Sequence, residues 1–400
     1  MCKMYNLLAK SEQLVRHTAT QYSRYLYTTV RWDNRLIGIK GARGTGKTTL
    51  LLQRLKSLQL PATKAAYFSL DDIFFTQNLF ADVAEQFYRE GGKMLFLDEV
   101  HKYPGWAREI KNLYDFFPDL QVVFTGSSII DLAKEEGDLS RRALMYELQG
   151  LSFREYLGLS GIVNIESLSL QDLIHSTTAI RDVFPADFRP LAHFRTYLSQ
   201  GYYPFFREDP EGFHQRLAQM VRVVVEYDMA ALKGFDPRNA RKLLQLLFIL
   251  SANVPYKPNL TQLAQKADVH RNTILNYLVY LENARLIRLL QASGAGLSLL
   301  QKPEKVYLNN TNLAYALSGE PPNTGNLRET FFFSQMQSLF TVTAPSQGDF
   351  LVDNQYLFEI GGKQKTYDQI AGHPNSYVVR DDLEYPVGKF FPLWVFGCLY

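Results

Sequence analysis

The chain has 400 residues, of which 46% are hydrophobic and 21% charged, which is enough for two or three domains with buried cores. Its 43 Lys and Arg residues nearly balance 40 Asp and Glu residues, so the net charge of +3 does not by itself predict a polyanionic partner. The two cysteines, Cys2 and Cys398, are far apart and lack metal-ligand spacing, so we expect no zinc site and no disulfide scaffold, and predict a cytoplasmic protein. The longest apolar run, at 243–250, is too short to predict a membrane span.

The first informative segment is GARGTGKTTL at 41–50, which has the GxxxxGK[ST] spacing of a phosphate-binding loop. Residues 35–40 before it indicate a short buried strand, and the leucines after it have helical spacing up to Pro61. In this order of strand, loop and helix, backbone N–H groups and the positive end of the helix converge on a phosphate. Lys47 is expected at the β- and γ-phosphates, and the Thr48 hydroxyl on Mg²⁺. The predicted nucleotide contacts are Gly41, Gly44, Thr45, Gly46, Lys47, Thr48 and Thr49.

A phosphate-binding loop also occurs in kinases and GTPases, so a second motif is needed to indicate the chemistry. Residues 93–97, KMLFL, predict an apolar strand that ends in Asp98 and Glu99. We expect Asp98 to hold the Mg²⁺ shell and Glu99 to polarise water, which predicts hydrolysis. The 51 residues from Lys47 to Asp98 accommodate a further strand, AAYFSL at 65–70, and a helix.

The next predicted strand, QVVFTGSS at 121–128, ends in small hydroxyl residues. Thr125, Ser127 and Ser128 are each available to bind the γ-phosphate and orient the attacking water. The alternative is that these hydroxyls only cap a turn before the next helix.

Two arginines, Arg141 and Arg142, precede the segment LMYELQGLSF. One of them is a candidate arginine finger, supplied within the chain or to a neighbouring subunit, and the alternative is a solvated surface residue. His101 follows the acidic pair, and we expect it to lie in a loop or helix start, because Glu99 already fills the role of base.

Several segments together resemble the archaeal-ATPase-like branch of the AAA+ ATPases, over nearly the whole chain. They are GARGTGKTTLL, FLDEVHKYPGWAREIKNLYD, VVFTGSSIIDL, RRALMYELQGLSFREYL, YLSQGYYPFF and VVVEYDMAAL. The resemblance implies ATP as the nucleotide, with Mg²⁺. It also implies that the family's Walker B pair is Asp98 and Glu99, its polar residue after the third strand is Ser127, and its arginine before the LSF segment is Arg142.

The predicted fold class is α/β, with four domains. Residues 1–150 form a P-loop AAA+ ATPase domain with a parallel sheet, and 151–240 a helical lid and linker. Residues 241–295 form a winged helix-turn-helix, and 296–400 a degenerate α/β restriction-endonuclease-like domain. The last two assignments depend on the resemblance as well as on local patterns.

The pattern behind the third domain is a set of apolar residues at 260–286, spaced as two short helices across a turn and followed by a strand pair. His270, Arg271, Asn272 and Asn276 are expected at the exposed N-terminal end of the second helix, as candidate contacts to duplex DNA. The alternative is a protein-contact module, because this helix also carries Glu282 and few basic residues.

Acidic residues in the last hundred positions suggest a nuclease site, formed by Glu329, Asp349, Glu359 and Lys363. Restriction-type nucleases use an acid and then an E-x-K unit, in which carboxylates bind Mg²⁺ and the lysine activates water. In this chain the position two residues after Glu359 is Gly361, and the lysine is displaced to 363. We therefore predict a retained fold with degenerate chemistry.

The predicted function is Mg²⁺-dependent ATP binding and hydrolysis that drives a conformational change in the winged helix and C-terminal domain. The alternative is a slow-turnover, ATP-gated switch that binds DNA or a protein partner. A metal-dependent DNA nuclease is the third hypothesis. An arginine finger that acts on a neighbouring subunit would require a homo-oligomer.

Overall fold

The protein is described by a computed structural model that covers residues 2–127, 139, 141–175, 179–229, 235–294, 302–318 and 322–400. It divides into two compact units, Met1–Gln149 and Gly150–Tyr400. The second unit contains the three regions that the sequence assigns to separate domains. Within the described residues, no helix is both long enough and apolar enough to cross a membrane.

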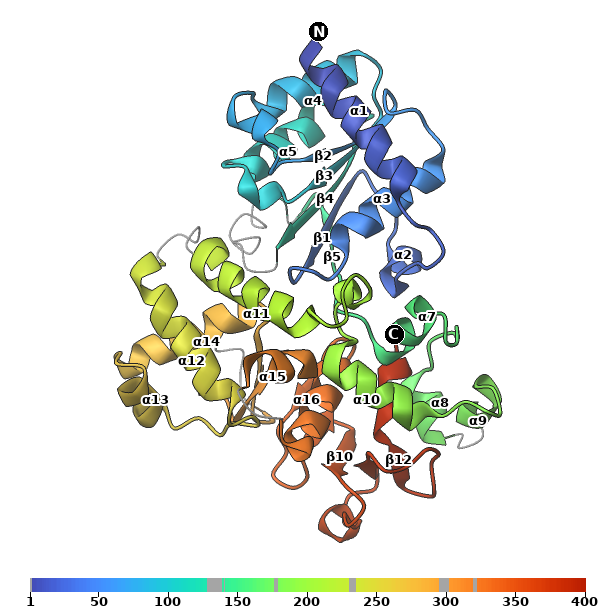
Figure 1. Ribbon diagram of the computed structural model, residues 1–400, viewed down its shortest axis with the longest axis vertical. Helices are drawn as coiled ribbons and strands as arrows, with labels where there is room; N and C mark the ends of the chain where they lie inside the picture. Colours follow the sequence, from blue (N-terminus) through green and yellow to red (C-terminus); the bar gives the residue numbers. More distant parts are fainter. Residues whose placement is uncertain are drawn as a thin grey trace. The chain divides into compact units, whose positions relative to one another are not determined.

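The first unit has a five-stranded parallel sheet in the order β2-β3-β4-β1-β5 (Figure 1). Its strands are β1 (Leu36–Gly41), β2 (Ala65–Ser69), β3 (Met94–Asp98), β4 (Gln121–Ser127) and β5 (Leu144–Glu147). Its helices are α1 (Cys2–His17), α2 (Tyr25–Thr29), α3 (Lys47–Leu58), α4 (Phe80–Arg89) and α5 (Trp106–Phe116), with 3₁₀ segments η1 (Ile73–Thr76) and η2 (Val100–Lys102). The strands predicted at 35–40, 65–70, 93–97 and 121–128 correspond to β1 to β4.

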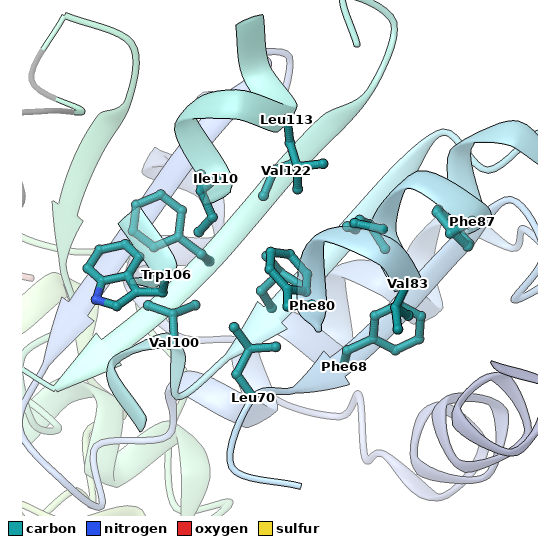
Figure 2. Close-up of a cluster of buried hydrophobic side chains, with 14 of the residues drawn as sticks. Phe68, Leu70, Phe80, Val83, Phe87, Val100, Trp106, Ile110, Leu113 and Val122 are labelled. Carbon is teal, nitrogen blue, oxygen red and sulfur yellow. The ribbon is translucent and has the colours of Figure 1, made fainter. Parts of the chain in front are cut away.

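Both faces of this sheet are buried by helices. Successive side chains of a strand point to opposite faces, so each strand contributes to both of the resulting clusters. On one face, Phe68 of β2 packs in a cluster with Phe80 of α4 and Trp106 of α5 (Figure 2). On the other face, Phe96 of β3 packs with Leu50 of α3. The parallel strands end at the same edge of the sheet, which brings their polar C-terminal residues together.

The second unit combines helices with two small sheets (Figure 1). Its helices are α7 (Phe153–Leu159), α8 (Leu170–His175), α9 (Ala179–Val183), α10 (Pro190–Gln200), α11 (Phe213–Val223), α12 (Ala240–Ser251), α13 (Leu260–Lys266), α14 (Arg271–Asn283), α15 (Thr311–Leu317) and α16 (Thr324–Met336). Shorter segments are η3 (Pro204–Arg207), the π-helical η4 (Val224–Asp228), η6 (Pro237–Asn239), η7 (Asp368–Ile370) and η8 (Leu393–Cys398).

Strands β6 (Ile287–Leu290) and β7 (Lys305–Leu308) form an antiparallel pair. The larger sheet has the order β12-β11-β10-β9-β8 and is mixed, since β10, β11 and β12 are parallel whereas β8 and β9 are antiparallel to their neighbours. Its strands are β8 (Val342–Thr343), β9 (Phe350–Val352), β10 (Tyr356–Gly361), β11 (Ser376–Arg380) and β12 (Phe390–Pro392).

The start of the predicted lid packs against the C-terminal segment of the same unit. Ser152 caps α7 in a capping box with Glu155, and its hydroxyl also donates to the Tyr400 carbonyl at 2.6 Å. The Phe153 ring lies 6.2 Å from the Trp394 ring in an edge-on arrangement. These contacts join residues about 240 positions apart, which local sequence patterns do not reveal.

The region at 260–308 has the predicted order of two helices and a strand pair. Asn259 caps α13 by accepting a hydrogen bond from the Gln262 amide. Strand β7 lies beyond residue 295, where we placed a domain boundary, so the pair formed by β6 and β7 crosses that boundary.

Candidate nucleotide-binding site and other polar clusters

The loop between β1 and α3 requires glycine at three of the predicted contact positions. Gly44 and Gly46 have φ angles of +80° and +95°, in the left-handed region that favours glycine. At Gly41, a Cβ atom would lie 2.5 Å from the Leu148 carbonyl oxygen, so no side chain fits without a backbone shift. The loop therefore closes tightly onto the edge of the sheet.

Lys47 stands in the first turn of α3, and its side chain lies along the loop. Its Nζ donates to the carbonyl oxygens of Gly41 at 2.9 Å and Ala42 at 3.0 Å. The buried Thr45 hydroxyl also donates to the Ala42 carbonyl, at 2.9 Å. Thr49, another predicted contact, is exposed one residue beyond Thr48.

Arg24 is a buried arginine that the sequence did not identify as a site residue, and it binds the backbone of this loop. The Arg24 guanidinium donates to the carbonyl oxygens of Thr45 at 2.6 Å and Gln149 at 2.8 Å. Arg24 is 21 residues before Thr45 and belongs to no motif, so only the tertiary structure reveals its role.

Asp98 ends β3 and is 2% exposed. Its carboxylate accepts hydrogen bonds from the Thr48 hydroxyl at 2.6 Å, the Tyr67 hydroxyl at 2.8 Å and the Thr125 hydroxyl. Burial, and then the charge of Asp98, raise the pKa of Tyr67, which keeps this phenol protonated as a donor. The predicted magnesium ligands Thr48 and Asp98 thus lie in direct contact.

Glu99 follows in the left-handed conformation, with φ at +51°. Such a backbone is uncommon for a residue other than glycine and occurs often at functional sites. The Glu99 amide donates to Asp98 Oδ1 at 3.1 Å and to Thr125 Oγ1 at 3.3 Å, which holds the turn. Burial raises the pKa of the Glu99 carboxyl; the charge of Lys47 opposes this rise and that of Asp98 adds to it.

Ser127 ends β4 and is buried, with Gly41 as its register partner on the adjacent β1. The structure therefore brings the end of the strand predicted at 121–128 beside the start of the phosphate loop. Ser128, the other serine considered, lies outside the described residues.

His101 is more than the loop or helix-start residue that the sequence analysis expected. It lies in η2, its side chain is 2% exposed, and its ring contacts both Glu99 and the Ser127 amide. The 3₁₀ turn after Glu99 brings these three residues together, although Ser127 is 26 residues further along the chain.

The candidate finger Arg142 forms a forked ion pair within the first unit. Its Nε and Nη2 atoms donate to the two carboxylate oxygens of Asp115, at 2.9 and 3.0 Å. Asp115 lies in the last turn of α5. The neighbouring Arg141 is exposed.

In the second unit, the four candidate DNA contacts are all exposed on or before the first turns of α14: His270, Arg271, Asn272 and Asn276. A shallow groove of about 450 Å³ lies at this end of the helix. Its lining includes three cations, Lys257, Arg271 and Lys302, and no acidic residue. Lys257 and Lys302 were not among the predicted contacts, because they precede α13 and β7 rather than lying on α14.

The predicted nuclease residues lie in a cluster that contains two lysines. Lys305 Nζ lies 3.0 Å from Glu329 Oε2 and 3.4 Å from Asp349 Oδ1, and the Tyr307 hydroxyl donates to Glu329 at 2.6 Å. Burial opposes the charge of Lys305, but the two carboxylates outweigh it and raise the pKa of the ammonium group.

The second lysine corrects our expectation about the E-x-K position. Lys363 is exposed, and Lys365 instead forms an ion pair with Glu359. Gly361 permits this pair, because a Cβ at that position would lie 2.7 Å from the Cβ and Cγ of Lys365. From alternation along the strand, we had expected no lysine to reach the Glu359 carboxylate. That expectation was wrong, because alternation does not describe the chain after the strand ends. Among the described residues, no group of three or more His, Cys, Asp or Glu side chains is arranged to hold a metal ion.

Two family models match separate parts of the chain. Residues 33–157 match a model described as an AAA domain, and residues 191–324 match one described as a domain of unknown function. The first match agrees with the parallel sheet and the phosphate loop, so residues 33–157 have the features of an AAA-type P-loop NTPase domain.

Individual proteins show more distant similarity. An uncharacterized protein of Methanocaldococcus jannaschii is 28% identical over 284 residues, which cover 68% of this chain and 60% of that relative. A Walker-type ATPase of Pyrococcus abyssi has a TM-score of 0.45 at 12% identity, over 76% of this chain and 99% of its own. A replication initiator, DnaA, bound to AMPPCP and single-stranded DNA has a TM-score of 0.31 at 16% identity, over 68% of this chain and 92% of its own.

Proposed function

We propose that the N-terminal unit binds ATP with Mg²⁺ and hydrolyses it. The observation that carries this proposal is the contact between Thr48 and Asp98 at 2.6 Å, with Glu99 held beside them. A hydroxyl and a carboxylate form the all-oxygen donor set that suits Mg²⁺, and the tight glycine loop suits a phosphate. Bound Mg²⁺ would neutralise charge on the phosphate oxygens.

Each nearby side chain has a defined role in this proposal. Lys47 leaves the carbonyls of Gly41 and Ala42 and donates to the phosphates of ATP. Glu99 accepts a proton from the attacking water, a task that its raised pKa favours at neutral pH. Ser127, beside the loop on β4, hydrogen-bonds to the terminal phosphate. Burial of Asp98, Tyr67 and Thr125 limits competing water around the carboxylate.

Steady-state ATP turnover tests this proposal, with the wild type compared with Glu99→Gln. We expect the variant to bind a fluorescent ATP analogue normally and to lose turnover about 100-fold or more, because a general base contributes about that much. Asp115→Asn separately tests whether release of Arg142 alters turnover. Equal turnover of wild type and Glu99→Gln would contradict the proposed base.

We further propose that hydrolysis drives a conformational change in the second unit. The alternative is a slow-turnover switch, in which ATP binding alone changes the affinity for DNA or a protein partner. Duplex-DNA binding distinguishes the hydrolysis-driven change from the switch. It is measured for the wild type with and without ATP, and for Glu99→Gln with ATP. A switch needs only the bound state, so the stalled variant would bind as the wild type does with ATP. An arginine-finger role for Arg142, within the chain or in a homo-oligomer, would require it to leave Asp115.

A second candidate function is contact with a nucleic-acid backbone through the groove at the start of α14. The groove is lined by three cationic residues, Lys257, Arg271 and Lys302, and by no acidic residue. It also lies at the N-terminal end of α14, which favours a negatively charged phosphate. This contact would suit a winged helix-turn-helix, which is our proposed assignment for the two helices and the strand pair. A nuclease receives less support, because lysines already compensate the carboxylates of the C-terminal cluster.

The salt dependence of DNA binding tests the groove. Each phosphate contact contributes about 0.9 to the slope of log K against log salt concentration. We therefore expect Lys257→Ala/Lys302→Ala to reduce that slope by about 2. Lys266→Ala/Lys363→Ala, which changes exposed lysines outside the groove lining, is the matched control. An unchanged slope in the first variant would contradict the proposal, and failure of the wild type to bind DNA would favour a protein partner.

A further inference from the structure

His101 lies between the proposed general base and the end of β4. Its Nε2 is 3.2 Å from Glu99 Oε2, and its Nδ1 is 3.2 Å from the Ser127 amide nitrogen. The imidazole is 2% exposed, whereas the Glu99 side chain is 32% exposed. The buried ring therefore holds the more exposed carboxylate from the protein side.

The two contacts indicate which tautomer the neutral ring adopts. The Ser127 amide can only donate, so Nδ1 must be the unprotonated, accepting nitrogen. In a neutral imidazole the proton is then on Nε2, which donates to Glu99. A doubly protonated ring would place an N–H against the N–H of Ser127, so the Ser127 amide disfavours that form.

We propose that His101 is a positioning residue that orients the Glu99 carboxylate and links it to the end of β4 through the Ser127 backbone. This inference rests on the proposed ATP hydrolysis at the same site. Ser127 is the register partner of Gly41 in the phosphate loop. A shift of the Ser127 backbone on phosphate binding would therefore move the His101 ring, and with it the Glu99 carboxylate. Glu99 is already held at the backbone by Asp98 and Thr125, which leaves its side chain as the part that needs orientation.

The tautomer of His101 provides a test that does not depend on turnover. The ¹⁵N chemical shifts of a histidine-labelled sample distinguish Nε2–H from Nδ1–H, and loss of one signal in His101→Gln assigns the residue. We expect the Nε2–H form, with a shifted Nε2 signal in Glu99→Gln and little change in Ser127→Ala, which retains the backbone amide. An Nδ1–H form, or no response to Glu99→Gln, would overturn the proposal.

Kinetics with three substitutions test the positioning role. His101→Gln places an amide donor near the position of Nε2, whereas the shorter amide of His101→Asn reaches only the position of Nδ1, and His101→Ala has neither group. We expect His101→Asn and His101→Ala to lower kcat about 10- to 100-fold, with the ATP dissociation constant within about twofold of wild type. We expect His101→Gln to recover most of this loss.

Thermal unfolding shows whether each of these variants folds, and any that does not is left out of the comparison. Normal kcat in a folded His101→Ala, or equal losses in folded His101→Gln and His101→Asn, would overturn the role proposed for the donor to Glu99. If the wild type itself does not hydrolyse ATP, the proposed function fails, while the tautomer measurement still tests the pair of His101 and Glu99.

Discussion

Both units of the chain gather buried or half-buried carboxylates, but they compensate the negative charge with different groups. In the first unit, the described partners of the Asp98 carboxylate are the hydroxyls of Thr48, Tyr67 and Thr125 and the amide of Glu99. In the second unit, Lys305 lies between Glu329 and Asp349, and Lys365 pairs with Glu359.

This difference indicates what each cluster is suited to do. Hydroxyl and amide groups orient a carboxylate without cancelling its charge, so Asp98 remains able to attract a cation. An ammonium group cancels the charge and occupies the position that a cation would take. The first cluster therefore suits ligand binding, and the second suits stabilisation of the fold.

The largest effect that separates the two clusters is expected from removing one carboxylate charge in each. Asp98→Asn should lower Mg²⁺-dependent ATP turnover about 100-fold, because a metal-holding charge is lost. Asp349→Asn should leave turnover within about twofold, since the C-terminal cluster has no role in the proposed hydrolysis. Turnover assays at saturating Mg²⁺, after thermal melts that verify folding, provide the measurement. Similar losses in both variants would remove the functional distinction.

A smaller effect is expected when the ammonium group is removed from the second cluster. Lys305→Met should lower the free energy of unfolding by about 2 kcal/mol, because Glu329 and Asp349 are left without their shared cation. This loss is somewhat smaller than the loss expected for a fully buried ion pair, since these side chains are only partly buried. The loss should decrease at acidic pH, where the carboxylates become protonated. Urea unfolding followed by tryptophan fluorescence measures the change.

Lys363→Met is the matched control, since Lys363 is an exposed residue of the same unit. A surface substitution of this kind is expected to change the free energy of unfolding by no more than about 0.5 kcal/mol. Equal stability of Lys305→Met and the wild type would show that the lysine is dispensable and that the cluster is open to other cations.

The smallest effect concerns the pH dependence of hydrolysis. Because burial raises the pKa of Glu99, the protonated and inactive carboxyl persists to higher pH than an ordinary glutamate with a pKa of 4.5. Turnover should therefore rise with pH through a value above 4.5, and kcat measured across the acidic range would detect this limb. A limb at the ordinary glutamate value would contradict either the burial of Glu99 or its role as the base.

Much of the first site was predictable from sequence because its parts are local. The spacing of Gly41, Gly46 and Lys47 specifies a strand, loop and helix, and an apolar run that ends in Asp98 specifies the adjacent strand. Arg24 and Tyr67 were not predicted as site residues, since neither has a sequence signal beyond its residue type. His101 was expected in a loop or helix start and was given no role at the site, and its contact with Ser127 could not be predicted because the two residues are 26 positions apart.

The second unit was less predictable, because its packing joins distant segments. The expected lid and C-terminal domain lie in one unit through contacts such as Phe153 with Trp394. A lysine at the E-x-K position was judged absent by counting along a strand, but Lys365 reaches Glu359 over Gly361 after the strand has ended. Counting fails there because a side chain several atoms long can span a turn.

The sequence by itself determined the phosphate loop, the acidic strand end and the order of helices and strands around them, since these depend on spacing and on the alternation of apolar residues. Only the tertiary structure decided which groups surround each carboxylate: hydroxyls at Asp98, an imidazole at Glu99 and ammonium groups at the C-terminal cluster. The physical reason is that charge compensation acts over a few ångströms in space, and the groups involved come from segments that are far apart along the chain.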